Sequence, residues 1–115
     1  MEEAYHQRLR RLMDEYVHNV YAATKKFPHE EIYGVTSQLR RASLSIILNY
    51  IEGYSRIKDK VHKNFLEISF GSLKESKYLI SFCYKEGYLN SVEYGSLSQQ
   101  IDEVAAMLWG TLRNV

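Results

Sequence analysis

The stretch that decides the fold is FPHEEIYGVTSQLRRASLSIILNYIEGYSR, residues 27–56. Within it, apolar side chains recur at alternating spacings of four and three residues: Val35, Leu39, Ala42, Ile46 and Tyr50. This spacing is typical of one helix face that packs against a core. A second apolar stripe lies on another face of the same helix: Leu44, Ile47, Leu48 and Ile51. We therefore predict that this helix is the central helix of its bundle and also contacts another surface.

The composition of the chain is that of an ordinary globular domain. Its 115 residues are 45% hydrophobic and 25% charged, so one core can form without metal or disulfide. The net charge of +1 gives no global argument for nucleic acid. Cys83 is the only cysteine, which excludes an internal disulfide. No segment reads as a signal peptide or a membrane span, and we expect a soluble, cytoplasmic protein without membrane contact.

Four helices with short connections are predicted for a single domain over residues 1–115, at about residues 4–26, 36–53, 58–86 and 91–113. Pro28 ends the first helix, because proline cannot continue a helix interior. Thr36 is the predicted N-cap of the second helix, and Gly53 is expected to end it in a left-handed conformation. Asn90 or Ser91 is expected to cap the fourth. Without any strand-like alternation, the fold class is all-α, an antiparallel up-down-up-down four-helix bundle.

The same spacing predicts which side chains of the other helices face the core. In the first helix they are Leu9, Met13, Tyr16, Val20 and Phe27. In the third they are Val61, Phe65, Ile68, Leu79 and Phe82, with Leu66, Leu73, Ile80 and Cys83 beside them. In the fourth they are Tyr94, Leu97, Ile101, Val104, Leu108 and Leu112. Gly71 and Ser72 are small, and they suggest a close helix crossing in the middle of the third helix.

Spaced residues within and around the opening stretch form a recognisable signature. Its centre is Phe27-Pro28, Tyr33-Gly34, 36–42 (TSQLRRA), Ser45-Ile46, Asn49, Glu52-Gly53 and Arg56. Its flanks are Val20-Tyr21, Thr24-Lys25, Phe65-Leu66, Ile68, Gly71-Ser72-Leu73 and Gly87-Tyr88-Leu89. From Val20 to Leu89 the chain resembles the four-helix-bundle family of proteins encoded by intervening sequences in bacterial 23S ribosomal RNA genes. It departs from that pattern at Ile47 and Leu48, where the family often has proline and a small residue.

The resemblance implies an antiparallel bundle that is often a ring-shaped homopentamer, with no established enzymatic activity. Relatives serve as accessory proteins of diversity-generating retroelements, where they bind nucleic acid and a reverse transcriptase. We therefore expect a homo-oligomer, most simply a pentamer. The second stripe of the central helix is the predicted oligomer interface: Leu44, Ile47, Leu48 and Ile51.

No motif for catalysis or metal binding stands out. Glu15-x-x-His18 and Asp59-x-x-His62 have the carboxylate–histidine spacing of di-metal sites in helix bundles, but the expected core faces place both histidines on flanking or outer surfaces. Cys83 lies on an apolar stripe and reads as a buried structural thiol. We expect no metal, no cofactor and no enzymatic activity.

Polar residues of the central helix admit two interpretations each. Asn49 and Glu52 lie on or beside its apolar faces, where they are expected to form a hydrogen-bonded pair that sets helix register, or else to bind a ligand. Arg40 and Arg41 point about 100° apart, so one can face water while the other meets a partner. Either arginine serves a structural ion pair or contacts a phosphate.

Basic side chains gather at one end of the expected bundle, where the first helix begins, the second meets the third, and the fourth ends. They are Arg8, Arg10, Arg11, Arg56, Lys58, Lys60, Lys63 and Arg113. Lysines at the start of the third helix oppose its dipole, and an anionic partner would relieve that conflict. Neutralisation by nearby acids is the alternative: Glu2, Glu3, Asp14, Glu15, Glu52 and Asp59.

These patterns favour a non-enzymatic, homo-oligomeric bundle that binds RNA or DNA through phosphate contacts, without sequence preference. The candidate contact residues are Arg8, Arg10, Arg11, Arg40, Arg41, Arg56, Lys58, Lys60 and Lys63. A protein-interaction scaffold, for example for a reverse transcriptase, is the alternative.

Overall fold

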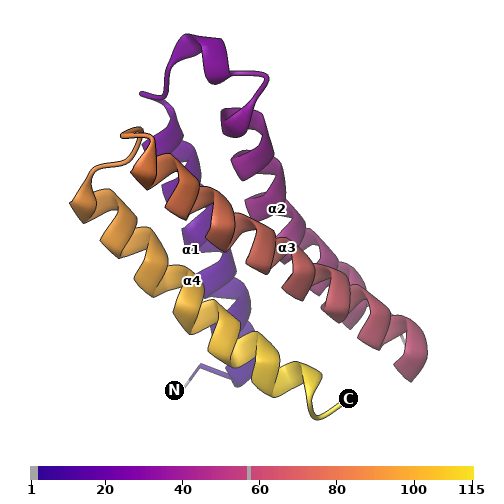
Figure 1. The fold of residues 1–115 in the computed structure, drawn as a ribbon. Coiled ribbons are helices and arrows are strands. Elements are labelled where there is room, and N and C mark those ends of the chain that lie inside the picture. The colour runs from indigo at the N-terminus through magenta and orange to yellow at the C-terminus, as the bar shows by residue number, and fades with distance from the viewer. Residues whose placement is uncertain (1–2, 57) are drawn as a thin grey trace.

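Four helices make up the computed structural model, which describes residues 3–56 and 58–115 (Figure 1). They are α1 (Tyr5–Thr24), α2 (Val35–Tyr54), α3 (Asp59–Lys85) and α4 (Ser91–Leu112), with a 3-10 turn η1 (His29–Glu31) between the first two. Within these ranges there is no strand, so the predicted all-α class is confirmed. None of the described helices is long and apolar enough to cross a bilayer.

The helices form a closed ring of neighbours, because α1 and α3 each pack against both α2 and α4. Contacts run in opposite order along each pair. In α1 and α2, for instance, His6 stacks on Tyr54, whereas Arg40 donates to Thr24. The other neighbouring pairs show the same reversal. Neighbours are therefore antiparallel, which is consistent with the predicted up-down-up-down bundle.

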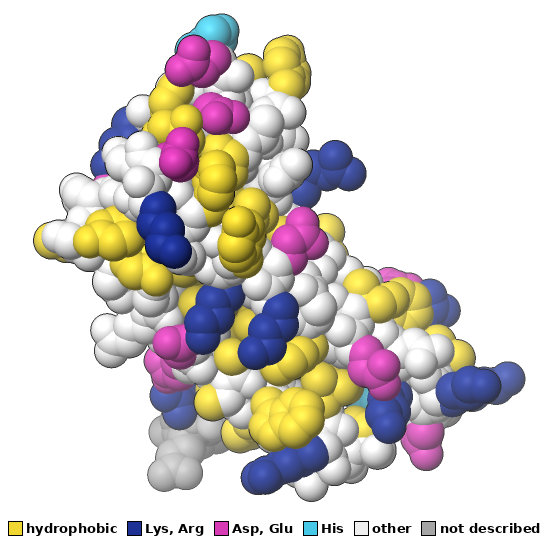
Figure 2. Space-filling view, in the orientation of Figure 1, with side chains coloured by type: hydrophobic (Ala, Val, Ile, Leu, Met, Phe, Trp, Pro, Cys, Tyr) yellow, Lys and Arg dark blue, Asp and Glu magenta, His cyan; other side chains and the backbone are white. Residues whose placement is uncertain are grey.

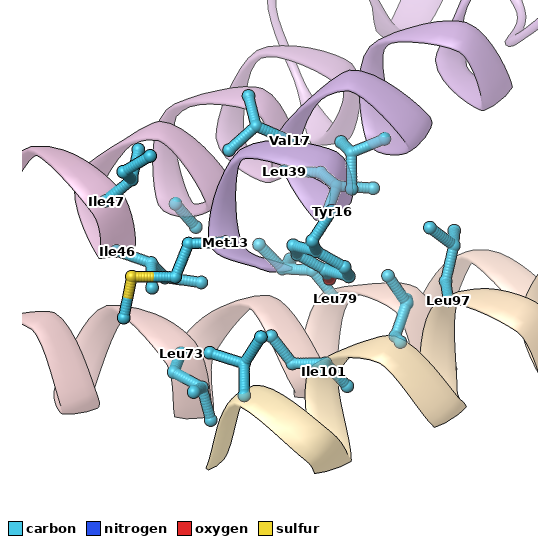
Figure 3. Packing of buried hydrophobic residues seen from close by; sticks show 14 of the residues in the cluster. Met13, Tyr16, Val17, Leu39, Ile46, Ile47, Leu73, Leu79, Leu97 and Ile101 are labelled. Atoms are coloured by element: carbon cyan, nitrogen blue, oxygen red, sulfur yellow. The ribbon is translucent and has the colours of Figure 1, made fainter. Parts of the chain in front are cut away.

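The core lies on the axis of this ring (Figure 3). All the side chains predicted for the inward faces of α1 and α2 are buried, and so are those of α4 except Tyr94, which is half-buried. Tyr16 is the largest side chain in the core, with about 1% of its surface exposed. Apolar spacing of three and four residues was therefore a sound guide in these three helices.

The predicted inward face of α3 was wrong. Ile68 is 50% exposed and Phe82 is also exposed, while Val61 and Phe65 are only half-buried. The buried stripe is the one that had been placed beside that face, and it includes two serines: Leu66, Ser69, Leu73, Ser76, Ile80 and Cys83, with Leu79 at its edge.

Buried hydroxyls explain how serines can occupy the α3 core face. Ser69 is fully buried, and its Oγ donates to the carbonyl oxygen of Ile46 at 2.6 Å. Ser76 is also fully buried, with its Oγ 2.6 Å from the hydroxyl of Tyr16. Serine is small enough for α2 and α3 to approach closely, and each hydroxyl has a partner, so its burial does not leave a polar group unsatisfied. Gly71, by contrast, is exposed and permits no close crossing.

Two helix ends, both of α2, differ from the sequence-based expectation. Helix α2 begins at Val35 with Gly34 as N-cap, and Thr36 is buried inside the first turn. The cap comes from Glu31, whose Oε1 accepts from the backbone N–H of Val35 at 3.3 Å. At its other end, Gly53 is helical, and a Cβ there would lie 3.3 Å from atoms of α3.

The left-handed glycine lies instead at Gly87, after α3, with φ of 81°. Asn90 caps α4 as predicted, and its side chain accepts from the backbone N–H of Glu93 at 2.8 Å. Every helix boundary lies within two residues of the predicted one.

Candidate nucleic-acid interface

The predicted basic end exists, because the start of α1 meets the ends of α2 and α4. The ring of His6 stacks on Tyr54 with centroids 5.5 Å apart. The hydroxyl of Tyr5 donates to the carbonyl oxygen of Met107 at 2.7 Å. Figure 1 shows both chain termini at this end of the bundle, with the α2–α3 turn projecting beside them. Cations from three separate segments therefore share one region of surface.

Two of the arginines in this region are neutralised within the chain. Arg8 pairs with Glu103 of α4 at 2.6 Å. Arg11 pairs with Glu3 at 3.0 Å and with Glu15 at 2.9 Å, and its hydrogen bond lowers the pKa of the Glu3 carboxyl. These contacts favour the structural alternative for both arginines. Glu2, the other acid expected here, lies outside the described residues.

Arg40 and Arg56 are also held by the fold. Arg40 donates to Thr24 at 2.8 Å and covers the ring of Tyr21 with its guanidinium 4.7 Å from the centroid. It therefore joins α2 to α1. Arg56 pairs with Glu52 one turn earlier in the chain and lies over an aromatic ring of α3. Both guanidinium groups therefore have partners within the chain, although Arg56 remains exposed.

The remaining predicted cations have no such partners. Lys58, Lys60 and Lys63 are exposed, and among the described residues no carboxylate lies within ion-pair distance of them. The same is true of Arg10 and Arg41. The three lysines span the N-terminal turns of α3, where unpaired backbone N–H groups already create positive potential. Lys58, which precedes α3, and Lys60 and Lys63 in its first turns are called here the lysines of the α2–α3 turn, and they are the most uncompensated basic part of the region.

An aromatic hollow borders these lysines, and the sequence analysis did not identify it. It lies between α3 and α4, has a volume of about 490 Å³, and is lined by Lys63, Glu67, Phe70, Gly71, Trp109, Leu112 and Arg113. Trp109 is 54% exposed. Figure 2 shows hydrophobic side chains among Lys and Arg side chains on this face. The available signal was that Trp109 falls outside the apolar face predicted for the fourth helix.

The predicted Asn49–Glu52 pair does not form. Asn49 donates to the carbonyl oxygen and to the hydroxyl of Ser45, both at 2.9 Å. Ser45 in turn lies 2.7 Å from Ser72, so this chain of bonds joins α2 to α3. Glu52 turns to Arg56 instead. A role in helix register remains supported for Asn49 alone.

The histidines of the two carboxylate–histidine motifs lie apart from one another. His18 is exposed, 3.4 Å from Asp14. His62 is half-buried rather than outward, and its Nδ1–H donates to the carbonyl oxygen of Gly53 at 2.6 Å. That bond fixes the end of α2 to the start of α3. The described ranges contain no group of three potential metal-ligating side chains.

The second stripe of α2 is less exposed than expected. Ile47 was predicted to lie in the oligomer interface, but it is only 9% exposed and belongs to the chain's own core. Leu44 and Ile51 are half-buried against that core. Leu48 alone is well exposed, at 58%. Any contact with another chain through this stripe would therefore centre on Leu48.

Comparison with known proteins identifies the family. The model of the 23S rRNA-intervening sequence protein family matches residues 7–110. This chain belongs to that family. The bundle resembles a crystal structure of a protein with unknown function from the S23 ribosomal protein family of Bacteroides thetaiotaomicron VPI-5482, with a TM-score of 0.83 and 18% identity. The match covers 90% of this chain and 97% of the other, and it shows a shared fold. No curated protein matches the chain.

Cys83 of this 23S rRNA-intervening sequence protein is expected to be inert in the folded state. It is fully buried, and burial together with the negative charge of Glu31 raises its pKa to about 11. At pH 8 the thiolate, which is the reactive form, is scarce. Alkylation by iodoacetamide at pH 8 should be at least tenfold slower in buffer than in denaturing urea, as measured by mass spectrometry. Equal rates would show that the thiol is accessible in the native protein.

Proposed function

We propose that this protein binds nucleic acid through phosphate contacts made by the lysines of the α2–α3 turn. The observation that carries the proposal is that Lys58, Lys60 and Lys63 are exposed at the N-terminal end of a long helix and have no carboxylate partner in the part of the chain that the structure describes. Their positive charges repel one another and the helix dipole. An anion would relieve this repulsion, and a nucleic-acid backbone supplies closely spaced phosphates. The proposed role is non-enzymatic and needs no cofactor.

The proposal includes assembly into a homo-oligomer, for which the family resemblance favours a pentamer. The exposed side chains of Leu48 and Ile68 support an apolar contact between copies. Cyclic symmetry would repeat the lysines of the α2–α3 turn around the assembly. Repetition raises the local potential and gives several weak phosphate contacts on one ligand, which increases the overall affinity.

Replacing Lys58, Lys60 and Lys63 together by glutamine should weaken binding to a labelled RNA or DNA oligonucleotide about tenfold or more at low salt. The plot of log K against log salt should also become shallower by up to about 2–3, because fewer counterions are released. Fluorescence anisotropy at several salt concentrations measures both quantities. Circular dichroism should show unchanged helicity, since all three side chains are exposed.

A matched variant removes the same charge from the opposite end of the bundle. Lys25, Lys26 and Lys85 are exposed there, and their joint replacement by glutamine should leave most of the binding intact. Equal losses in the two variants would mean that only net charge matters. If the wild type binds no nucleic acid at low salt, the proposal fails, and the protein-interaction scaffold becomes the better interpretation.

A further inference from the structure

The hollow between α3 and α4 has features that the phosphate contacts do not explain. Trp109 exposes 54% of its surface, although a buried indole contributes strongly to the stability of a core or an interface. Phe70 lies beside it, with ring centroids 5.8 Å apart and planes inclined at 43°. The exposed indole of Trp109 and the half-buried ring of Phe70 therefore form an aromatic wall of the hollow. A wall of this kind in a hollow of about 490 Å³ is large enough to receive a small planar ligand.

The two rings are not equally available. The ammonium group of Lys74 lies over the ring of Phe70, 5.3 Å from its centroid, in a cation–π contact. This cation competes with a ligand for the face of Phe70. Trp109 has no cation over its ring among the described residues. The indole is therefore the surface on which a flat group can stack, and Lys74 provides a positive charge beside it.

Gly71 keeps part of the hollow free of side chains. A glycine inside a helix costs about 1 kcal/mol relative to alanine. Among the described residues, no close contact requires a glycine at position 71, because a Cβ there would meet no atom within 4 Å. Gly71 also lines the hollow, so a longer side chain at this position would occupy its space. The absence of a side chain at Gly71 therefore leaves space for a ligand in the hollow and does not serve the packing of the bundle.

Charge indicates what kind of planar ligand fits. Lys63 and Arg113 line the hollow, against one acidic side chain, Glu67. With Lys74 close by, the surroundings are net positive. Lys63 also belongs to the lysines of the α2–α3 turn, so the hollow is continuous with the proposed phosphate-binding region. A ligand that combines planar rings with flanking negative charges matches this arrangement.

We propose that an unpaired base of single-stranded nucleic acid stacks on Trp109 while its flanking phosphates contact Lys63 and the α2–α3 turn. This inference rests on the proposed function and adds a preference for single strands, since bases within a duplex are not free to stack on a side chain. Stacking on an aromatic ring does not depend on base identity, so little sequence preference is expected.

Trp109 is the only tryptophan of the chain, so its fluorescence reports on this site alone. A single-stranded dodecathymidylate should quench the emission in proportion to binding. The oligonucleotide paired with its complement should bind through phosphate contacts with little quenching. Anisotropy of a labelled oligonucleotide, measured in parallel, records binding independently of the indole.

Trp109→Leu should weaken binding of the single strand about five- to a hundredfold and leave duplex binding nearly unchanged. Trp109→Phe should restore most of that affinity, because a ring is present again. Tyr78→Leu is the matched control, since Tyr78 is an exposed aromatic residue of α3 that does not line the hollow. It should bind both ligands like the wild type.

Three outcomes would overturn the inference. In the first, Trp109→Leu binds the single strand as tightly as the wild type. In the second, the single strand binds without quenching, which leaves the proposed function intact but removes the base from Trp109. In the third, the emission depends on protein concentration and not on the oligonucleotide, which would place Trp109 between copies of the chain. Failure of both ligands to bind would instead reject the proposed function itself.

Discussion

Ile47→Asp is expected to unfold the protein, with a loss of about 4 kcal/mol or more in the free energy of unfolding. Ile47 belongs to the core, so an aspartate there would bury a carboxylate without a charged partner. A loss of this size is a large part of the total stability of a small domain. Urea denaturation followed by circular dichroism measures the effect.

Leu48→Asp is the matched control, one residue along the same helix. Leu48 is 58% exposed, so its replacement should leave the helicity and the free energy of unfolding of the isolated chain nearly unchanged. If copies of the chain meet at this side chain, light scattering should give a smaller species for Leu48→Asp than for the wild type. An unchanged mass would exclude Leu48 from the subunit contact. An Ile47→Asp protein that stays helical and only dissociates would contradict the burial of Ile47.

Leu73→Ala should lower the free energy of unfolding by about 2–5 kcal/mol, because it leaves a cavity in a fully buried position of α3. Ile68→Ala, on the same helix, should lower it by about 1 kcal/mol or less, since half of the Ile68 surface is already in water. Urea midpoints of the two variants give the comparison. Equal losses would mean that the third helix presents the face first expected from its sequence.

The third helix shows where apolar spacing stops being informative. Its buried face contains Ser69 and Ser76, which a hydrophobicity pattern reads as polar, and its exposed face contains Ile68 and Phe82, which the same pattern reads as core. The serines are buried because specific partners on α1 and α2 satisfy their hydroxyls. Such partners come from tertiary contacts, so no local pattern reveals them. In the other helices every side chain predicted for the inward face is buried, except Tyr94, which is half-buried.

The sequence was enough to predict that basic side chains gather at one end of the bundle, but not which of them have carboxylate partners. In an up-down-up-down bundle, chain order alone places the start of the first helix and the end of the fourth helix at the same end. Which cations stay uncompensated depends on whether a carboxylate lies within reach. Arg8 pairs with Glu103 of a neighbouring helix, whereas no carboxylate among the described residues lies within ion-pair distance of Lys60. Glu31 was also missed, although it caps α2 and accepts from the hydroxyl of Tyr88 at 3.1 Å. Its partner Val35 lies only four residues along the chain, but Tyr88 lies 57 residues away and is brought near by the fold.

The buried serines also bear on why the bundle adopts a single alignment of its helices. The core face of α3 is nearly self-similar over seven residues, with leucine then serine at 66 and 69 and again at 73 and 76. At these four positions, a slide of α3 by seven residues would again place a leucine and a serine where a leucine and a serine lie now. The hydroxyl partners differ, however: one serine meets a backbone carbonyl and the other a tyrosine. A slide by seven residues would bring only one of the two serines to a hydrogen-bonding partner and would leave the other hydroxyl without its partner in the interior, so the two bonds together favour the observed register.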